Sequence, residues 1–150
     1  MKRVQGVALM RLHIALVAAV LALGACVQLP PHPQEAQAKQ FQTMPDKSVI
    51  YVVRNDPDIN RLPTHLMLDN RGGVTTYPGT FFRWEVAPGH HRIAGFSSDS
   101  GMIEFDTEPG KIYFVRQVVL GFRSPISNLQ RTSEQDGRAV AMRGKLISVL

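Results

Sequence analysis

The chain has 150 residues, of which 44% are hydrophobic and 19% charged, and it contains one cysteine. These totals fit one ordinary domain, and a single cysteine excludes both an intramolecular disulfide and a zinc site built from several cysteines. The 17 Lys and Arg against 12 Asp and Glu give a formal charge of +5, which favours a nucleic-acid partner only if the folded domain carries that charge.

The first 25 residues have the pattern of an export signal. Lys2, Arg3 and Arg11 precede an uncharged, mostly apolar run of twelve residues from Ile14 to Ala25, as in the basic and hydrophobic regions of a signal peptide. The run is shorter than the about 20 apolar residues that a membrane-spanning helix needs. The sequence therefore predicts a signal peptide over residues 1–25.

The signal ends in Leu23-Gly24-Ala25-Cys26, which resembles the lipobox of bacterial lipoproteins. The resemblance implies cleavage before Cys26, lipid attachment at Cys26 and a membrane partner reached through that anchor; a conventional signal peptide with an incidental cysteine is the alternative. Val27 stands where an Asp resembles an inner-membrane retention signal. In a Gram-negative host this favours the outer membrane, with the domain facing the periplasm.

Cleavage changes the meaning of the net charge. It removes three of the 17 basic residues and no acidic one, which leaves 14 Lys and Arg against 12 Asp and Glu. A nearly neutral exported domain lacks the electrostatic footprint of a nucleic-acid-binding protein. We therefore expect no nucleic-acid partner.

Residues 26–46 have the composition of a flexible tether. From Val27 to Asp46 there are four prolines, five glutamines and a single aromatic residue, Phe41, and such a segment is too polar to form a core. Residues 34–42 are compatible with a short helix.

Residues 47–150 are expected to form a small antiparallel β-sandwich. Ten of the eleven aromatic residues lie between Tyr51 and Phe122, and short apolar runs alternate with turn residues such as Pro-Gly pairs. The predicted strands are Ser48–Arg54, Thr64–Asp69, Val74–Tyr77, Thr80–Val86, His91–Phe96, Met102–Thr107, Ile112–Leu120, Ser127–Gln130 and Lys145–Val149. Ser48–Arg54 and Ile112–Leu120 are apolar on both faces, as central strands are.

The segment 133–143 allows two interpretations. Ser133 is followed three residues later by Asp136, and Gly144 is a possible helix stop, which together favour a short helix. Gly137 is unfavourable inside a helix by about 1 kcal/mol, and Asp136-Gly137 also suits a hairpin turn.

Three motifs that suggest chemistry are incomplete. Asp56–Asn60 begins like a calcium loop, but Arg61 and Met67 stand where Gly and Glu are required. His90 and His91 are adjacent, so on a strand they point to opposite faces and cannot bind one metal. Residues 95–99 approach a nucleophile elbow, but end in Asp instead of Gly. We therefore expect no metal, no cofactor and no enzymatic activity.

A polar cluster remains as a candidate ligand site. Arg54, Trp84, Glu85 and Arg116 combine charged groups with an aromatic side chain, which suits a carboxylate or a sugar. Charged residues in apolar strands also serve as structural ion pairs or protect sheet edges.

The order of several segments is similar to a family of small bacterial lipoproteins classed as a domain of unknown function. The segments are IYVVRN (residues 50–55), PGTFF (78–82), WEVAPGHH (84–91) and GKIYFVRQ (110–117), and the strand units also resemble PEGA-type sandwiches. The resemblance implies an envelope location and a compact β-sandwich but no catalytic residues. Residues 56–63 depart from the pattern. The expected function is a non-enzymatic interaction domain with an envelope-protein or cell-wall partner; the alternative is a small-ligand or glycan-binding module.

Overall fold

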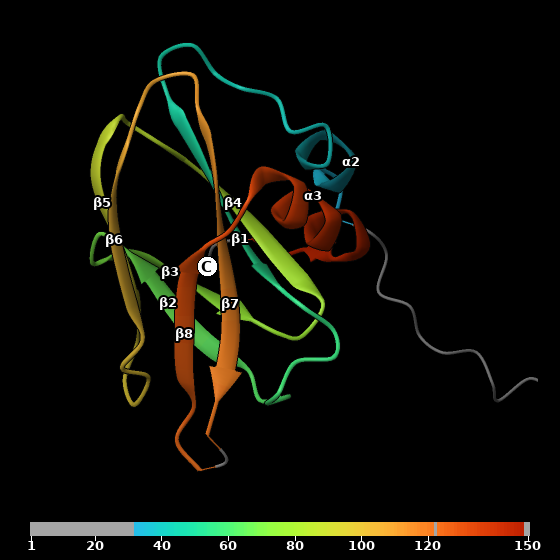
Figure 1. Cartoon of the computed structure of the whole chain (residues 1–150), viewed down its shortest axis with the longest axis vertical. Coiled ribbons are helices and arrows are strands. Elements are labelled where there is room, and N and C mark those ends of the chain that lie inside the picture. The colour runs from blue at the N-terminus through green and yellow to red at the C-terminus, as the bar shows by residue number, and fades with distance from the viewer. Residues whose placement is uncertain (1–31, 122, 149–150) are drawn as a thin grey trace, which may run out of the picture. The chain divides into compact units, whose positions relative to one another are not determined.

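The computed structural model describes residues 32–121 and 123–148. The predicted signal peptide, Cys26 and the start of the tether lie outside the described residues. The described part is mainly β, with two sheets and a short helix near the end of the chain (Figure 1). This confirms the predicted fold class.

The first sheet has five strands in the order β8-β7-β1-β4-β9. Their bounds are Ser48–Arg54 for β1, Thr80–Val86 for β4, Ile112–Leu120 for β7, Ile126–Arg131 for β8 and Lys145–Leu146 for β9. Every residue of the central strand β1 is buried, as its apolar character on both faces predicts. The sheet is mixed and not wholly antiparallel as expected, because β1 is parallel to β7 and β4 is parallel to β9.

The second sheet is antiparallel and has the order β3-β2-β5-β6. Its strands are β2 Thr64–Leu68, β3 Arg71–Thr76, β5 Gly89–Gly95 and β6 Met102–Thr107. The chain leaves the first sheet twice. After β1 it forms β2 and β3 and returns as β4, and after β4 it forms β5 and β6 and returns as β7, so that β4 and β7 flank β1. The turn glycines Gly79 and Gly110 have φ values of +73° and +72°, as the second central residue of a type II turn requires.

The main core lies between the two sheets. Ile50, Phe82 and Val115 from the first sheet pack against Leu66 and Ile93 from the second. These side chains alternate along each strand with residues on the opposite face, so one face of the first sheet is left for another layer.

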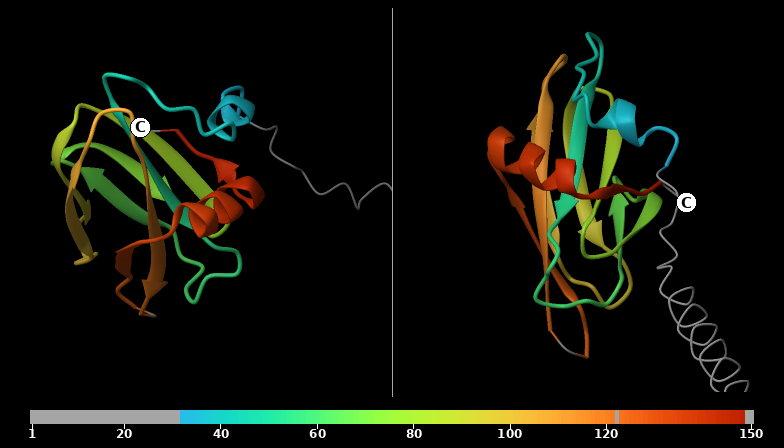
Figure 2. Two further views of the ribbon diagram at one scale, coloured as in Figure 1. Left: turned by 45° about the horizontal axis from the view of Figure 1, so that its top comes forward. Right: turned by 90° about the vertical axis from the view of Figure 1, so that its right-hand side faces the viewer.

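Two helices supply that layer. Helix α2, Glu35–Ala38, and helix α3, Glu134–Arg143, cover the outer face of the first sheet (Figure 2). The helix interpretation of residues 133–143 is confirmed: the Oγ atom of Ser133 accepts a hydrogen bond from the Asp136 N–H at 3.1 Å. Gly137 permits the packing, since a Cβ there would lie 2.3 Å from the Phe114 ring.

Part of the expected tether belongs to the folded unit. Ala38 and Phe41 are buried, and the Phe41 ring lies 5.2 Å from that of Tyr51 and 5.9 Å from that of Phe114. The Tyr51 hydroxyl donates to the Ala38 carbonyl at 2.6 Å. The aromatic outer face of the first sheet thus gives Phe41 a place to pack, and the segment from residue 35 to at least residue 41 is structured against it.

Within residues 32–121 and 123–148, no helix is long and apolar enough to span a membrane.

Candidate functional site

The structure does not bring the four candidate ligand residues together. Arg54 and Trp84 project between the two sheets, whereas Glu85 and Arg116 project from the helix-covered face of the first sheet. The division follows from strand alternation, because neighbouring residues such as Trp84 and Glu85 point in opposite directions. We therefore describe each residue in its own surroundings.

Trp84 is a core residue. Its side chain is 7% exposed and packs edge-on against Phe82, with ring centroids 4.1 Å apart. It belongs to the cluster between the sheets. The indole therefore cannot serve as the open aromatic wall of a ligand site.

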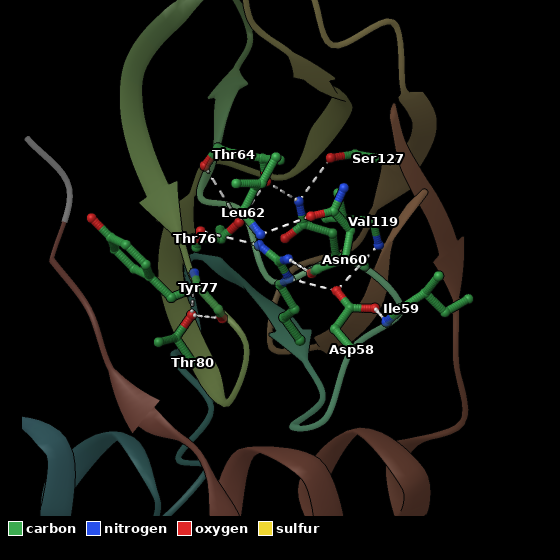
Figure 3. Close-up of polar contacts among 12 residues, drawn as sticks. Asp58, Ile59, Asn60, Leu62, Thr64, Thr76, Tyr77, Thr80, Val119 and Ser127 are labelled. Atoms are coloured by element: carbon green, nitrogen blue, oxygen red, sulfur yellow. Dashed lines mark hydrogen bonds and ion pairs between the residues drawn. The ribbon is translucent and has the colours of Figure 1, made fainter. Parts of the chain in front are cut away.

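Arg54 forms a buried ion pair. It is 1% exposed, and its Nε donates to Asp58 Oδ2 at 2.6 Å (Figure 3). Its two terminal nitrogens donate to the carbonyls of Thr76 at 3.2 Å and Asn60 at 2.5 Å. Asp58 Oδ2 also accepts the Val119 N–H at 3.2 Å. The sequence left open whether Arg54 binds a ligand or forms a structural ion pair, and this geometry supports the ion pair.

The buried polar groups continue from Arg54 across the interior. The Nε2 atom of Gln117 donates to the hydroxyls of Thr64 and Ser127, both at 2.8 Å. The N–H of Ser127 in turn donates to Asp99 Oδ1 at 2.7 Å. Asp99, which stands where a nucleophile elbow requires glycine, thus connects the loop after β5 to β8 through this hydrogen bond.

The side chains of His90 and His91 have different surroundings, as their adjacent positions on strand β5 predict. His91 is buried, with Nδ1 2.7 Å from Asp69 Oδ2 and Nε2 2.7 Å from the Ala87 carbonyl. His90 is exposed, with Nδ1 3.0 Å from Asp106 Oδ1. Within residues 32–121 and 123–148, no three acidic, histidine or cysteine side chains are arranged to hold a metal ion.

Glu85 lies in a polar cavity of about 410 Å³. It pairs with Arg83, and Lys47 Nζ lies 3.5 Å from its Oε2 atom. The Arg83 hydrogen bond outweighs burial and, with Lys47, holds the pKa of Glu85 below its usual value. The carboxylate is therefore ionised and positioned between two cations.

The other walls of this cavity come from segments that sequence reasoning did not connect with Glu85. Gln34, Gln37 and Gln42 line it, together with the apolar residues Leu146 and Ile147. A charged pair, several amides and an apolar edge in a cavity of this volume suit a small polar molecule. The glutamine-rich composition that predicted a tether was the signal available for this wall.

Arg116 lies in a different cavity. It is exposed on β7 and, with Arg143 of α3, lines a space of about 330 Å³. Glu85 and Arg116 pair with opposite ends of β1, at Val49 and Val53. The two cavities are therefore separate sites on the same face.

The comparisons with known proteins add no relative: no protein-family model matches the chain, and no curated protein matches it.

Proposed function

We propose that the protein is a membrane-anchored lipoprotein of the bacterial cell envelope, lipidated at Cys26, whose β domain is a non-enzymatic interaction module. The observation that carries the proposal is Leu23-Gly24-Ala25-Cys26 directly after a basic and then an apolar stretch, with the chain's one cysteine at the lipid-accepting position. The likeness to small bacterial lipoproteins agrees with it. An outer-membrane anchor with the domain in the periplasm is the location that Val27 favours.

The charged side chains of the described interior contact partners within the fold. Arg54 and Asp58 neutralise each other, and Asp99 is occupied by the N–H of Ser127. Because these buried groups are occupied within the fold, we place recognition on the exposed surface of the domain. The partner we expect is an envelope protein or a component of the cell wall.

Metabolic labelling tests the anchor. Cells expressing the full chain are grown with radiolabelled palmitate, and label is expected in the wild type but not in Cys26→Ala. Val27→Ala, which alters the neighbouring residue and leaves the cysteine, serves as the matched control and should remain labelled. Equal labelling of wild type and Cys26→Ala, or no label in either, would contradict the proposal.

The second candidate function is a small-ligand or glycan-binding module, and the cavity beside Glu85 favours it. Its ion pair and glutamine amides offer both donors and acceptors to hydroxyl groups. Soluble muropeptides and simple sugars are titrated into the protein by calorimetry. Binding is expected to weaken in Glu85→Gln and Gln37→Ala, and to persist in Glu104→Gln, whose exposed carboxylate lies on β6. Absence of binding by all probes, or equal binding by all variants, would eliminate this candidate.

A further inference from the structure

The second cavity on the helix-covered face has features of a binding site. It lies between α3 and the end of β1, with a volume of about 330 Å³. The side chains that matter for its chemistry are those of Arg116 on β7 and Arg143 at the end of α3. The elements that hold them are separate in sequence and are fixed by the packing of α3 on the sheet.

The two arginines are the main reason to expect a ligand. Arg83, Arg92 and Arg138 each pair with a glutamate, and Arg54 pairs with Asp58. No such ion pair within the described residues includes Arg116 or Arg143. Two guanidinium groups in one cavity without carboxylate partners favour an anion, which each can bind through paired N–H donors.

One acidic group also lines the cavity. Asp136 accepts a hydrogen bond from the Ser133 hydroxyl at 2.7 Å and lies in the first turn of α3, where a negative charge is favourable. It is thus committed to the start of the helix. The charged side chains in the wall, two positive and one negative, leave the cavity with an excess positive charge.

The rest of the wall indicates what accompanies the anionic group. Ala139 and Val140 contribute apolar surface, and the cavity is larger than a carboxylate or phosphate group alone.

We propose that this cavity binds a small organic acid, with its carboxylate or phosphate group held by Arg116 and Arg143 and its apolar body against Ala139 and Val140. The site is independent of the lipid anchor and of the cavity beside Glu85.

The test uses three probes with one body and different head groups: butyrate, butyl phosphate and the neutral butyramide. They are titrated into the ¹⁵N-labelled full chain in uncharged detergent at constant ionic strength, and the side-chain Nε–H signals of the arginines are followed by NMR. We expect saturable shifts of the Arg116 and Arg143 signals with at least one acid and none with butyramide. Arg116→Gln and Arg143→Gln should each weaken binding by about tenfold or more, the effect of losing a charge-assisted hydrogen bond.

Arg138→Gln is the matched control, because it removes the same charge from the same helix at a residue that pairs with Glu134. It should bind as the wild type does. Saturation by butyrate alone or by butyl phosphate alone supports the site and identifies the head group. Non-saturating shifts, equal shifts with butyramide, or an equal loss of binding in Arg138→Gln would overturn the proposal.

Discussion

Replacing Asp58 by Asn tests whether the buried Arg54 depends on its one carboxylate. Asp58 Oδ2 lies 2.6 Å from Arg54 Nε, and the side chain of Arg54 is 1% exposed and that of Asp58 3% exposed. Asn is nearly isosteric with Asp and can still accept hydrogen bonds. The change therefore removes the negative charge and leaves the guanidinium buried beside two carbonyl groups.

The expected loss of stability is large because solvent cannot compensate the charge. Breaking a buried ion pair by removing one partner costs about 3–5 kcal/mol, which is a large part of the about 5–15 kcal/mol by which a domain is stable. The pair Glu134–Arg138 provides a matched control, because it has the same four-residue spacing but side chains that are 62% and 39% exposed, in that order. Glu134→Gln should cost less than about 0.5 kcal/mol.

Urea unfolding followed by fluorescence measures both variants. Trp84 is the chain's one tryptophan and is buried in the core, so its emission reports on unfolding of the domain. The midpoint for Asp58→Asn should fall by about 2 M, and the double variant Arg54→Met/Asp58→Asn should lose less, because no charge remains buried. A loss below about 1 kcal/mol for Asp58→Asn, within the range of exposed pairs, would refute the reasoning.

Three further predictions use the same assay. Phe41→Ala should destabilise the domain by about 3 kcal/mol, since the ring is 7% exposed; no change would mean that the segment is a tether after all. Gly137→Ala should destabilise by about 1–3 kcal/mol, because the added Cβ meets the Phe114 ring at 2.3 Å; stabilisation, usual for this change in a helix, would contradict the packing described. Burial raises the pKa of Asp69, but hydrogen bonds from the Arg92 N–H and His91 outweigh this and leave it below its usual 3.8. The carboxylate therefore stabilises the fold above pH 3.8 and ceases to do so as the pH falls through the lower folded value. Asp69→Asn should accordingly lower the midpoint at pH 7 and have little effect below that folded value; an equal effect at both would exclude this role.

Strand positions were predictable where local pattern and burial agree. The bounds of β1, β4, β6 and β7 coincide with the predicted ones, because their apolar residues satisfy the alternation or two-sided burial of strands. β3 begins three residues earlier than predicted, at Arg71, since its Gly72 and Gly73 have no apolar side chains to indicate pairing with β2. The parallel pairing of β1 and β7 was not predictable, because it depends on where the intervening strands assemble.

The candidate site was predictable only in composition. Arg54, Trp84, Glu85 and Arg116 were identified as residues whose charged and aromatic groups could bind a ligand. Residue type alone did not show that they are dispersed, with Arg54 and Trp84 between the sheets and Glu85 and Arg116 on the other face of the first sheet. The glutamines beside Glu85 were missed because they come from a segment whose polarity predicted a tether. Phe41 is the single aromatic residue of that polar segment. Its burial depends on Tyr51 and Phe114, which lie further along the chain and form the surface on which its ring packs.

The sequence by itself determined the β-rich character and the central strand, and it carries the expectation of a lipid anchor at Cys26, since each rests on local residue types and spacing. Tertiary structure alone decided that Arg54 is neutralised by Asp58, that Phe41 belongs to the fold, and that Arg116 shares a cavity with Arg143. The physical reason is that desolvation and cavity formation depend on which faces of distant segments meet, and local patterns do not specify those meetings.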